Sequence, residues 1–560
     1  MDFLIHNIAP IIFLSMVVLL LIGYPVAFSL AATGVIFGLV GIELGLLQPS
    51  LFQALPDRIW GVMNNDTLLA IPFFTFMGLI LERSGMAEDL LETIGQLFGP
   101  VRGGLAFAVI FVGAMLAATT GVVAASVISM GLISLPIMLR YGYDKRLASG
   151  VIAASGTLAQ IIPPSLVLII MADQLGRSVG DMYKGAFIPG FTLTGLYVGY
   201  VILVTMIRPN WAPALPAEAR TIREPNGKSG LLSLAVVVAL AIAVAVGFEH
   251  WYYANQPDAP TDEKVVLLMA SGVILAFLLA VFNKVFKLGL LSRMAEQVTF
   301  VLIPPLLLIF LVLGTIFLGI ATPTEGGAMG ATGALIMAVL RKRLDVKLLK
   351  QAMESTAKLT AFVVFILVGA RVFSLTFYGV DGHKWVEHLL LDLPGGQVGF
   401  LIVVNILVFL LAFFLDFFEL SFIVVPLLGP VAEKLGIDLI WFGVLLGVNM
   451  QTSFMHPPFG FALFYLRSVA PASVKTTDIY WGAVPFVVIQ VIMVALIIVF
   501  PGLVTMGLDK KVDVDVDKVQ LDIPLDQMNE PDLTPPGADT SAPDLPPPDI
   551  PPPESDSAKK

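Results

Sequence analysis

The side chains of this chain that are capable of chemistry are small polar groups inside apolar stretches. The first half supplies hydroxyls and glycine backbones at Thr119, Thr120, Gly121, Ser126, Ser155, Gly156 and Thr157. The second half supplies carboxylates, amides and hydroxyls at Asp416, Glu419, Asn449, Gln451, Thr452 and Ser453. Because hard cations prefer such oxygen ligands, we predict that both groups bind a small cation such as sodium.

Each of these residues also has a structural explanation. Small residues let membrane helices pack closely, and buried amides can hydrogen-bond to a neighbouring helix. The acidic pair Asp416 and Glu419 could instead touch water at the mouth of a hairpin, although carboxylates inside a membrane are functional candidates by default. For single residues such as Gly121 and Asn449, both explanations stay open at this point.

Adjacent prolines follow both polar groups: Pro163-Pro164 in "SGTLAQIIPPS" and Pro457-Pro458 in "NMQTSFMHPPF". Proline removes a backbone donor and blocks the helical bond four residues back. In hydrocarbon the freed backbone groups are tolerated only inside protein or beside a water-filled cavity. We therefore predict two broken helices around a binding site.

The elements that would position these groups recur 294 residues apart, since 136–163 matches 430–457 in the spacing of its prolines and in its loop. The loop 140–146 is mainly basic, whereas the loop 433–438 is mainly acidic. Under the positive-inside rule the first loop is cytoplasmic and the second external. The two copies should therefore be inverted, which is an architecture of secondary transporters.

Composition fixes the fold class as an all-α polytopic membrane protein. Of 560 residues, 57% are hydrophobic and 13% charged, and the mean hydropathy is +0.90. Many apolar runs approach the roughly 20 residues that cross a bilayer, whereas a β-barrel would show short alternating segments. The absence of cysteine excludes disulfides and thiol chemistry. The first span, Ala9 to Ala32, is expected to be retained because it lacks a basic leader.

The chain divides into six predicted regions. They are N-terminal spans with an interfacial helix (1–99), a first inverted repeat (100–207) with a re-entrant hairpin (119–138) and a broken helix (147–172), a loop with two inserted spans (208–295), connecting scaffold spans (296–393), a second inverted repeat (394–505) with a re-entrant hairpin (416–432) and a broken helix (438–466), and an acidic, proline-rich tail (506–560). The composition of the tail predicts disorder.

Three single residues outside these groups could have a functional or a structural role. Arg371 is an isolated cation in an apolar helix, where it could attract an anionic substrate or simply snorkel or pair. Glu325 fits a helix start with Thr322 or Thr324 as the cap, although it could face a transport path. His456 is expected to be packed. The sequence shows no metal-ligand cluster, phosphate loop or nucleophilic triad, so we predict no enzyme activity and no ATP hydrolysis.

Several segments resemble the large membrane (permease) subunit of TRAP (tripartite ATP-independent periplasmic) transporters, in a long form with a central insertion. The resemblance covers about 5–210 and 295–505, and includes "IPFFTFMGLILERSG", "GIATPTEGGAMGA" and "PPFGFALFYL". It implies an elevator-type, sodium-driven importer of organic acid anions (dicarboxylates, oxo acids or similar) in the bacterial inner membrane. It also implies two partners, a small membrane subunit and a periplasmic substrate-binding protein. Ser126 departs from the family, which often has an acidic residue there.

Two other functions remain open from the residues. A self-sufficient ion- or proton-coupled anion symporter of related architecture would transport substrate without partner proteins. A membrane scaffold or intramembrane enzyme would need a paired base and nucleophile, or metal ligands at one depth, and the sequence offers neither. We expect no cofactor besides the coupling ion Na⁺, and no nucleic acid partner.

Overall fold

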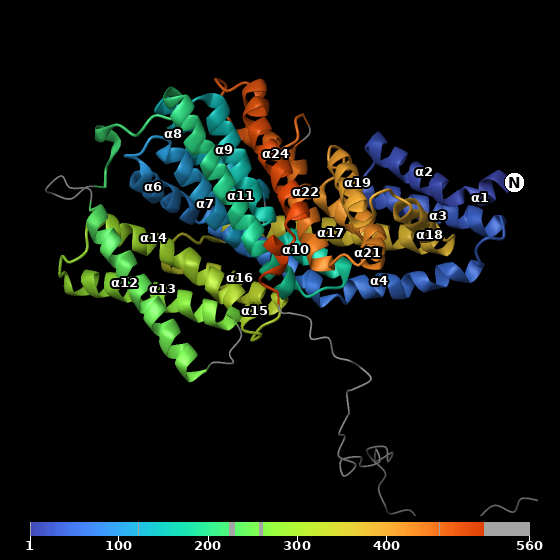
Figure 1. Ribbon diagram of the computed structural model, residues 1–560, viewed down its shortest axis with the longest axis horizontal. Coiled ribbons are helices and arrows are strands. Elements are labelled where there is room, and N and C mark those ends of the chain that lie inside the picture. Colours follow the sequence, from blue (N-terminus) through green and yellow to red (C-terminus); the bar gives the residue numbers. More distant parts are fainter. Residues whose placement is uncertain (1, 121–122, 223–229, 257–260, 459, 509–560) are drawn as a thin grey trace, which may run out of the picture. The chain divides into compact units, whose positions relative to one another are not determined.

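The computed structural model describes residues 2–120, 123–222, 230–256, 261–458 and 460–508, and all regular structure in these ranges is helical (Figure 1). Eight helices are long and apolar enough to cross a membrane, or up to ten if each of two bent pairs counts as one span. The predicted all-α polytopic fold is therefore confirmed. Most of the predicted tail, 509–560, lies outside the described residues.

The first half of the chain contains eleven α-helices within the described ranges. They are α1 (Asp2–His6), α2 (Ile8–Ile22), α3 (Val26–Glu43), α4 (Leu55–Met63), α5 (Ala70–Arg83), α6 (Met86–Phe98), α7 (Gly104–Thr120), α8 (Val123–Arg140), α9 (Lys145–Thr157), α10 (Leu166–Leu175) and α11 (Val179–Ile207).

The second half follows an inserted pair of helices. The insertion is α12 (Leu231–Asn255) and α13 (Thr261–Phe286), and the later helices are α14 (Arg293–Ile309), α15 (Thr315–Phe317), α16 (Pro323–Leu340), α17 (Val346–Gly379), α18 (Gly382–Leu391), α19 (Gly396–Leu411), α20 (Phe417–Glu419), α21 (Val425–Lys434), α22 (Leu439–Gln451), α23 (Phe461–Val469), α24 (Thr476–Val499) and α25 (Gly502–Thr505).

When the residue numbers of the first half are shifted by 294, its helices fall on the helices of the second half. Shifted by 294, α9 covers the same positions as α22, and each has 13 residues. Both helices start alike: the side chain of Asp144 accepts from two backbone N–H groups of α9, and that of Asp438 does the same for α22. An N-cap of this kind satisfies donors that have no partner within the helix. The same shift carries α8 onto 417–434, which α20 through α21 occupy.

The predicted first hairpin, 119–138, overlaps a continuous helix, and whether this segment re-enters the membrane stays a prediction. Residues 123–140 form one continuous helix, α8, whose length and hydropathy qualify it as a candidate span. A Cβ on Gly113 of α7 would lie 3.2 Å from Cε of Met130 on α8, so the two helices pack closely against each other. Apolar side chains, and no proline before Pro136, keep α8 intact.

The predicted second hairpin, 416–432, also differs from expectation. Residues 417–434 are helical throughout, with a π-helical turn at Leu420–Val424 between α20 and α21. Such turns insert one extra residue into a helix and often mark functional positions. The segment therefore forms a single irregular helix, and whether it crosses the membrane or re-enters stays a prediction.

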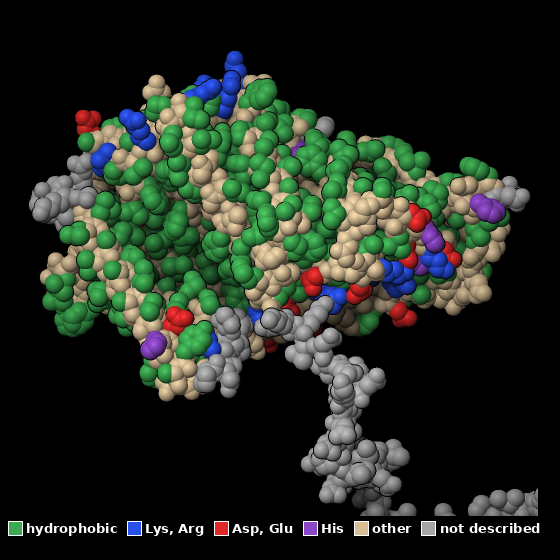
Figure 2. Space-filling view, in the orientation of Figure 1, with side chains coloured by type: hydrophobic (Ala, Val, Ile, Leu, Met, Phe, Trp, Pro, Cys, Tyr) green, Lys and Arg blue, Asp and Glu red, His purple; other side chains and the backbone are tan. Residues whose placement is uncertain are grey.

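The two loops with opposite charge lie at opposite ends of the described helices. The first loop joins α8 to α9, and Lys145 at its end donates to the backbone oxygen of Ser473 at 2.7 Å. Glu433 near the second loop pairs with Arg177 at 2.9 Å. Figure 2 shows basic side chains along the upper edge, above α8 and α9, and mixed charges along the lower right edge. This separation fits inverted repeats.

The inserted helices α12 and α13 pack on each other as a hairpin. A Cβ on Gly272 of α13 would lie 3.1 Å from the backbone oxygen of Ala241 on α12, so the two helices approach closely. At the hairpin end, the Tyr252 hydroxyl bonds to Glu263 at 2.6 Å. In the most apolar window of each helix only 11% of residues are buried, so most of the apolar surface is available to lipid.

Candidate functional site

Two half-helices from opposite halves of the chain meet end to end. The helix α9 ends at Thr157 and α22 ends at Gln451, and Nε2 of Gln451 donates to Oγ1 of Thr157 at 3.1 Å. Both side chains are fully buried. The two residues are 294 positions apart, so they are equivalent in the two repeats. The broken helices therefore converge at a single buried point.

The segments that follow α9 and α22 turn in the same way after this junction. Each passes through a short 3₁₀ turn, Leu158–Gln160 or Thr452–Phe454, and then a cis peptide bond, Pro163-Pro164 or Pro457-Pro458. The helices α10 and α23 start a few residues later. The C-terminal ends of α9 and α22 carry partial negative charge, and the N-terminal ends of α10 and α23 carry partial positive charge.

The hydroxyl of Thr157 is fully used in this arrangement. Its oxygen accepts from Nε2 of Gln451 at 3.1 Å and, more weakly, from Nε2 of Gln490 at 3.5 Å, and it donates to the backbone oxygen of Ala154 at 2.8 Å. A hydroxyl has one donor and two acceptor lone pairs. The Thr157 hydroxyl therefore joins α9, α22 and α24, and its oxygen has no lone pair left for a cation.

Gln490 is a site residue that the sequence reasoning missed. It lies on α24, fully buried, and its Nε2 also donates to the Tyr197 hydroxyl on α11 at 2.9 Å. A lone amide in an apolar span was the available signal, since polar residues are expensive at that depth and usually have a role. Gln160, in the first 3₁₀ turn and almost fully buried, was missed for the same reason.

Several buried side-chain oxygens around the breaks have no hydrogen-bond partner among the described residues. They are Oε1 of Gln160, Gln451 and Gln490, and Oγ of Ser453. All four residues are at most 3% exposed. Because buried polar atoms are nearly always paired, these oxygens are the atoms at the breaks that retain acceptor capacity for a cation or an ordered water.

The remaining predicted residues of the first half pack the broken helix against the hairpin. The Ser155 hydroxyl donates to the backbone oxygen of Val151 at 2.6 Å. A Cβ on Gly156 would lie 2.3 Å from a methyl of Val127 on α8, so only glycine permits this contact. Ser126 is buried beside Val127. Thr119 and Thr120 end α7, and Gly121 lies outside the described residues.

In the second half, Asn449 makes contacts between helices. Its Nδ2 donates to the backbone oxygen of Asn405 on α19 at 2.8 Å and to the side-chain oxygen of the same residue at 2.9 Å. Thr452 donates to the backbone oxygen of Asn449 at 2.6 Å. These bonds are the helix-packing alternative that the sequence left open for Asn449.

The acidic pair forms a capping box. The backbone N–H of Glu419 donates to Oδ1 of Asp416, and the backbone N–H of Asp416 donates to Oε2 of Glu419, both at 2.9 Å. This reciprocal pair starts α20. The box uses one oxygen of each carboxylate, and sodium binding by this pair stays a prediction.

The three isolated residues are placed as follows. Glu325 forms a capping box with Thr322 at the start of α16, which confirms its predicted capping role. His456 is buried between the rings of Phe409 and Phe413, with centroids 4.3 and 4.2 Å away, so it is packed as expected. Arg371 is exposed on α17, whereas the junction of the broken helices is buried.

Comparisons with known proteins give one consistent result. The family model described as "Tripartite ATP-independent periplasmic transporter, DctM component" matches residues 13–503. A C4-dicarboxylate TRAP transporter large permease protein from Rhodobacter capsulatus is 26% identical over 498 residues, covering 88% of this chain and 97% of the relative.

Two further relatives are longer than the region they share with this chain. A sialic acid TRAP transporter permease protein from Haemophilus influenzae is 24% identical, covering 87% of this chain and 66% of the relative. An isethionate TRAP transporter permease protein from Oleidesulfovibrio alaskensis is 23% identical, covering 83% of this chain and 61% of the relative.

Proposed function

Because this chain belongs to the DctM component family of tripartite ATP-independent periplasmic transporters, we propose that it forms the transport path of a sodium-driven importer of organic acid anions. As the large permease subunit of such a transporter, it is a multi-pass inner-membrane protein and a transport component rather than an enzyme. Sodium coupling, the substrate class and an elevator mechanism are the parts that we propose.

The substrate class is suggested by the relatives and by the helix ends. The three relatives are named for C4-dicarboxylate, sialic acid and isethionate, which are all acids. In the chain described here, the positive N-terminal ends of α10 and α23 lie beyond the two breaks. Such ends favour anions in broken-helix transporters, so we propose that they receive the acidic group of the cargo.

The observation that carries the proposal is the bond between Gln451 and Thr157. It brings two C-terminal helix ends, which favour cations, to one buried point. The unpaired oxygens of Gln451 and Ser453 supply acceptors there. We propose that sodium binds at the two breaks through these oxygens and backbone carbonyls, together with 119–121 and Ser126 in the first half.

For the mechanism we propose that the two hairpin regions and both broken helices move as one body against the remaining helices. The bodies would alternate the site between the two sides, as inverted-repeat transporters do. The cargo would arrive on a periplasmic binding protein, and a small membrane subunit would complete the complex, as the family description implies.

The test is uptake of labelled C4-dicarboxylate, sialic acid or isethionate into proteoliposomes containing this chain, the small membrane subunit and the matching binding protein. We expect uptake only with an inward sodium gradient, and strong loss in Gln451→Ala but not in Gln397→Ala, whose side chain is exposed and bonds only to the backbone of Leu435. Equal uptake without any ion gradient would contradict the proposal. Equal uptake by the chain alone would favour the self-sufficient symporter.

A further inference from the structure

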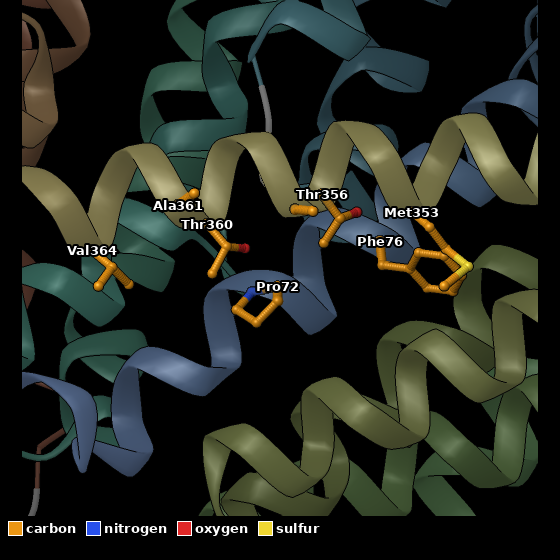
Figure 3. Close-up of a pocket in the computed structure, with 8 residues that line it drawn as sticks. Pro72, Phe76, Met353, Thr356, Thr360, Ala361 and Val364 are labelled. Atoms are coloured by element: carbon orange, nitrogen blue, oxygen red, sulfur yellow. The ribbon is translucent and has the colours of Figure 1, made fainter.

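A groove of about 500 Å³ lies between α5 and α17, away from the junction of the broken helices. Figure 3 shows Met353, Thr360 and Val364 of α17 directed toward Pro72 and Phe76 of α5. The volume is within the range of small-molecule sites, which are mostly apolar with a few placed polar groups. The groove therefore has the size and lining of a site for an apolar chain.

Two hydroxyls beside this groove lack the bond that hydroxyls in several other helices of the chain make. Thr33, Thr299 and Ser421 each donate to the backbone oxygen four residues earlier. The buried hydroxyl oxygens of Thr356 and Thr360, one turn apart on α17, have no partner among the described residues. A buried donor without an acceptor is costly, so an occupant whose acceptor oxygens reach these two hydroxyls would be favoured.

One end of the groove is basic. Arg83 at the end of α5 is exposed and reaches across to α17, where it donates to the side chains of Gln351 at 3.1 Å and Ser355 at 3.4 Å. These two bonds use part of its five N–H donors. The neighbouring Lys347 adds positive charge, whereas Lys350 lies 3.9 Å from Glu354. An anionic group would be favoured at this end, one residue from Thr356.

We propose that this groove binds one anionic phospholipid of the cytoplasmic leaflet. Its phosphate contacts Arg83, its ester carbonyl oxygens accept from Thr356 and Thr360, and one acyl chain lies along Ala361 and Val364. A glycerophospholipid has this order of groups: a charged head, then acceptor oxygens, then an apolar chain. The basic sequence just before α17 places the Arg83 end on the side where anionic lipids attract Lys and Arg.

The test is lipid retention by the purified full-length chain. The protein is delipidated in detergent, incubated with phosphatidylglycerol or phosphatidylcholine, and examined by native mass spectrometry. We expect the original chain to retain one phosphatidylglycerol molecule. The Ala361→Phe variant should not retain it, because the phenylalanine side chain fills the groove. Ala239→Phe, at an exposed position of α12, should keep it. Thr360→Val, which conserves shape, should weaken retention without affecting folding.

The contribution of the positive charge of Arg83, at the basic end of the groove, is tested separately. Arg83→Gln should weaken phosphatidylglycerol binding about fivefold, the scale of one exposed charge contact. Arg58→Gln removes an exposed charge near Tyr378, at the other end of α17, and should leave phosphatidylglycerol binding unchanged. Equal retention of phosphatidylcholine and phosphatidylglycerol, or an unchanged lipid count in Ala361→Phe, overturns the proposal. Neither outcome depends on transport activity.

Discussion

The break after α9 and the break after α22 share their backbone and differ in their side chains. Each follows a 13-residue helix with an aspartate cap, and each continues through a 3₁₀ turn and a cis Pro-Pro bond. In the first break the hydroxyls of Ser155 and Thr157 are used within the protein. Among the described residues, oxygens of Gln451 and Ser453 are unpaired in the second break, and Oε1 of Gln160 is unpaired in the first.

This difference shows that the geometry of the break and its chemistry are specified separately. A cap and two prolines are enough to start and stop a half-helix. The side chains at the stop are then free to differ between the halves. Because Thr157 serves as the acceptor that joins the halves, we expect the ion chemistry to depend more on the second break, and the following variants examine that asymmetry.

The largest effect should come from helix packing that only the first half has. A Cβ on Gly150 of α9 would lie 2.1 Å from the backbone oxygen of Gly482 on α24. Gly150→Val should therefore cost about 3 kcal/mol or more. At the equivalent position, Val444→Gly should cost about 2 kcal/mol, from lost packing and helix propensity. Thermal unfolding in detergent measures both, and equal losses would show that α9 and α22 are packed alike.

The next largest effect should come from Thr157→Val. This variant keeps the shape of the side chain but removes the acceptor for the amide groups of Gln451 and Gln490. Buried donors without partners should lower the free energy of unfolding by about 1–3 kcal/mol. Thermal unfolding is the measurement, with Thr194→Val on α11, which loses only a bond to its own helix, as the control. A loss no greater than that of the control would remove Thr157 as the link between halves.

A moderate effect is expected at the capping box of α20. Asp416→Ala removes the acceptor for the Glu419 backbone and should cost about 1 kcal/mol, whereas Asp416→Asn keeps a good N-cap and should cost little. If the carboxylate acts only as a cap, sodium should stabilise the Asn variant as much as the original chain. Loss of that stabilisation in Asp416→Asn would assign Asp416 to the ion site.

The smallest effect on folding should come from Ser453→Ala. The Ser453 hydroxyl has no partner among the described residues, so its removal should leave thermal stability in potassium nearly unchanged. In sodium, the variant should lose part of the stabilisation seen in the original chain, because an ion ligand is missing. Ser155→Ala, in the first break, should keep the sodium effect. The reverse pattern would place the ion chemistry in the first half.

The local pattern was enough to locate the breaks, because prolines and aspartate caps act within a few residues of their position. The offset of 294 likewise pointed to the segments that meet at Thr157 and Gln451. Small polar residues suggested a turn within 119–138, whereas the apolar majority of this segment belongs to the continuous helix α8.

Other parts of the site could not be predicted because they depend on contacts between distant helices. Gln490 gains its role from Tyr197 and Thr157, which are 293 and 333 positions away. The box at Asp416 and Glu419 was predictable in principle, since its spacing is that of Thr322 and Glu325, for which a cap was proposed. Its apolar surroundings favoured the functional interpretation instead.

The bond between Thr157 and Gln451 joins two positions that are equivalent in the two repeats. Suppose that the opposite-facing state arises when the two halves exchange conformations. Each contact between the halves is then replaced by the contact between the two equivalent residues. Only a contact between two equivalent positions keeps the same pair of residues. We therefore expect this contact to be kept in both facing states, inside the body that carries both broken helices. Since the chain has no cysteine, a disulfide between Thr157→Cys and Gln451→Cys can be tested cleanly, and exchange between the facing states should persist when it is closed.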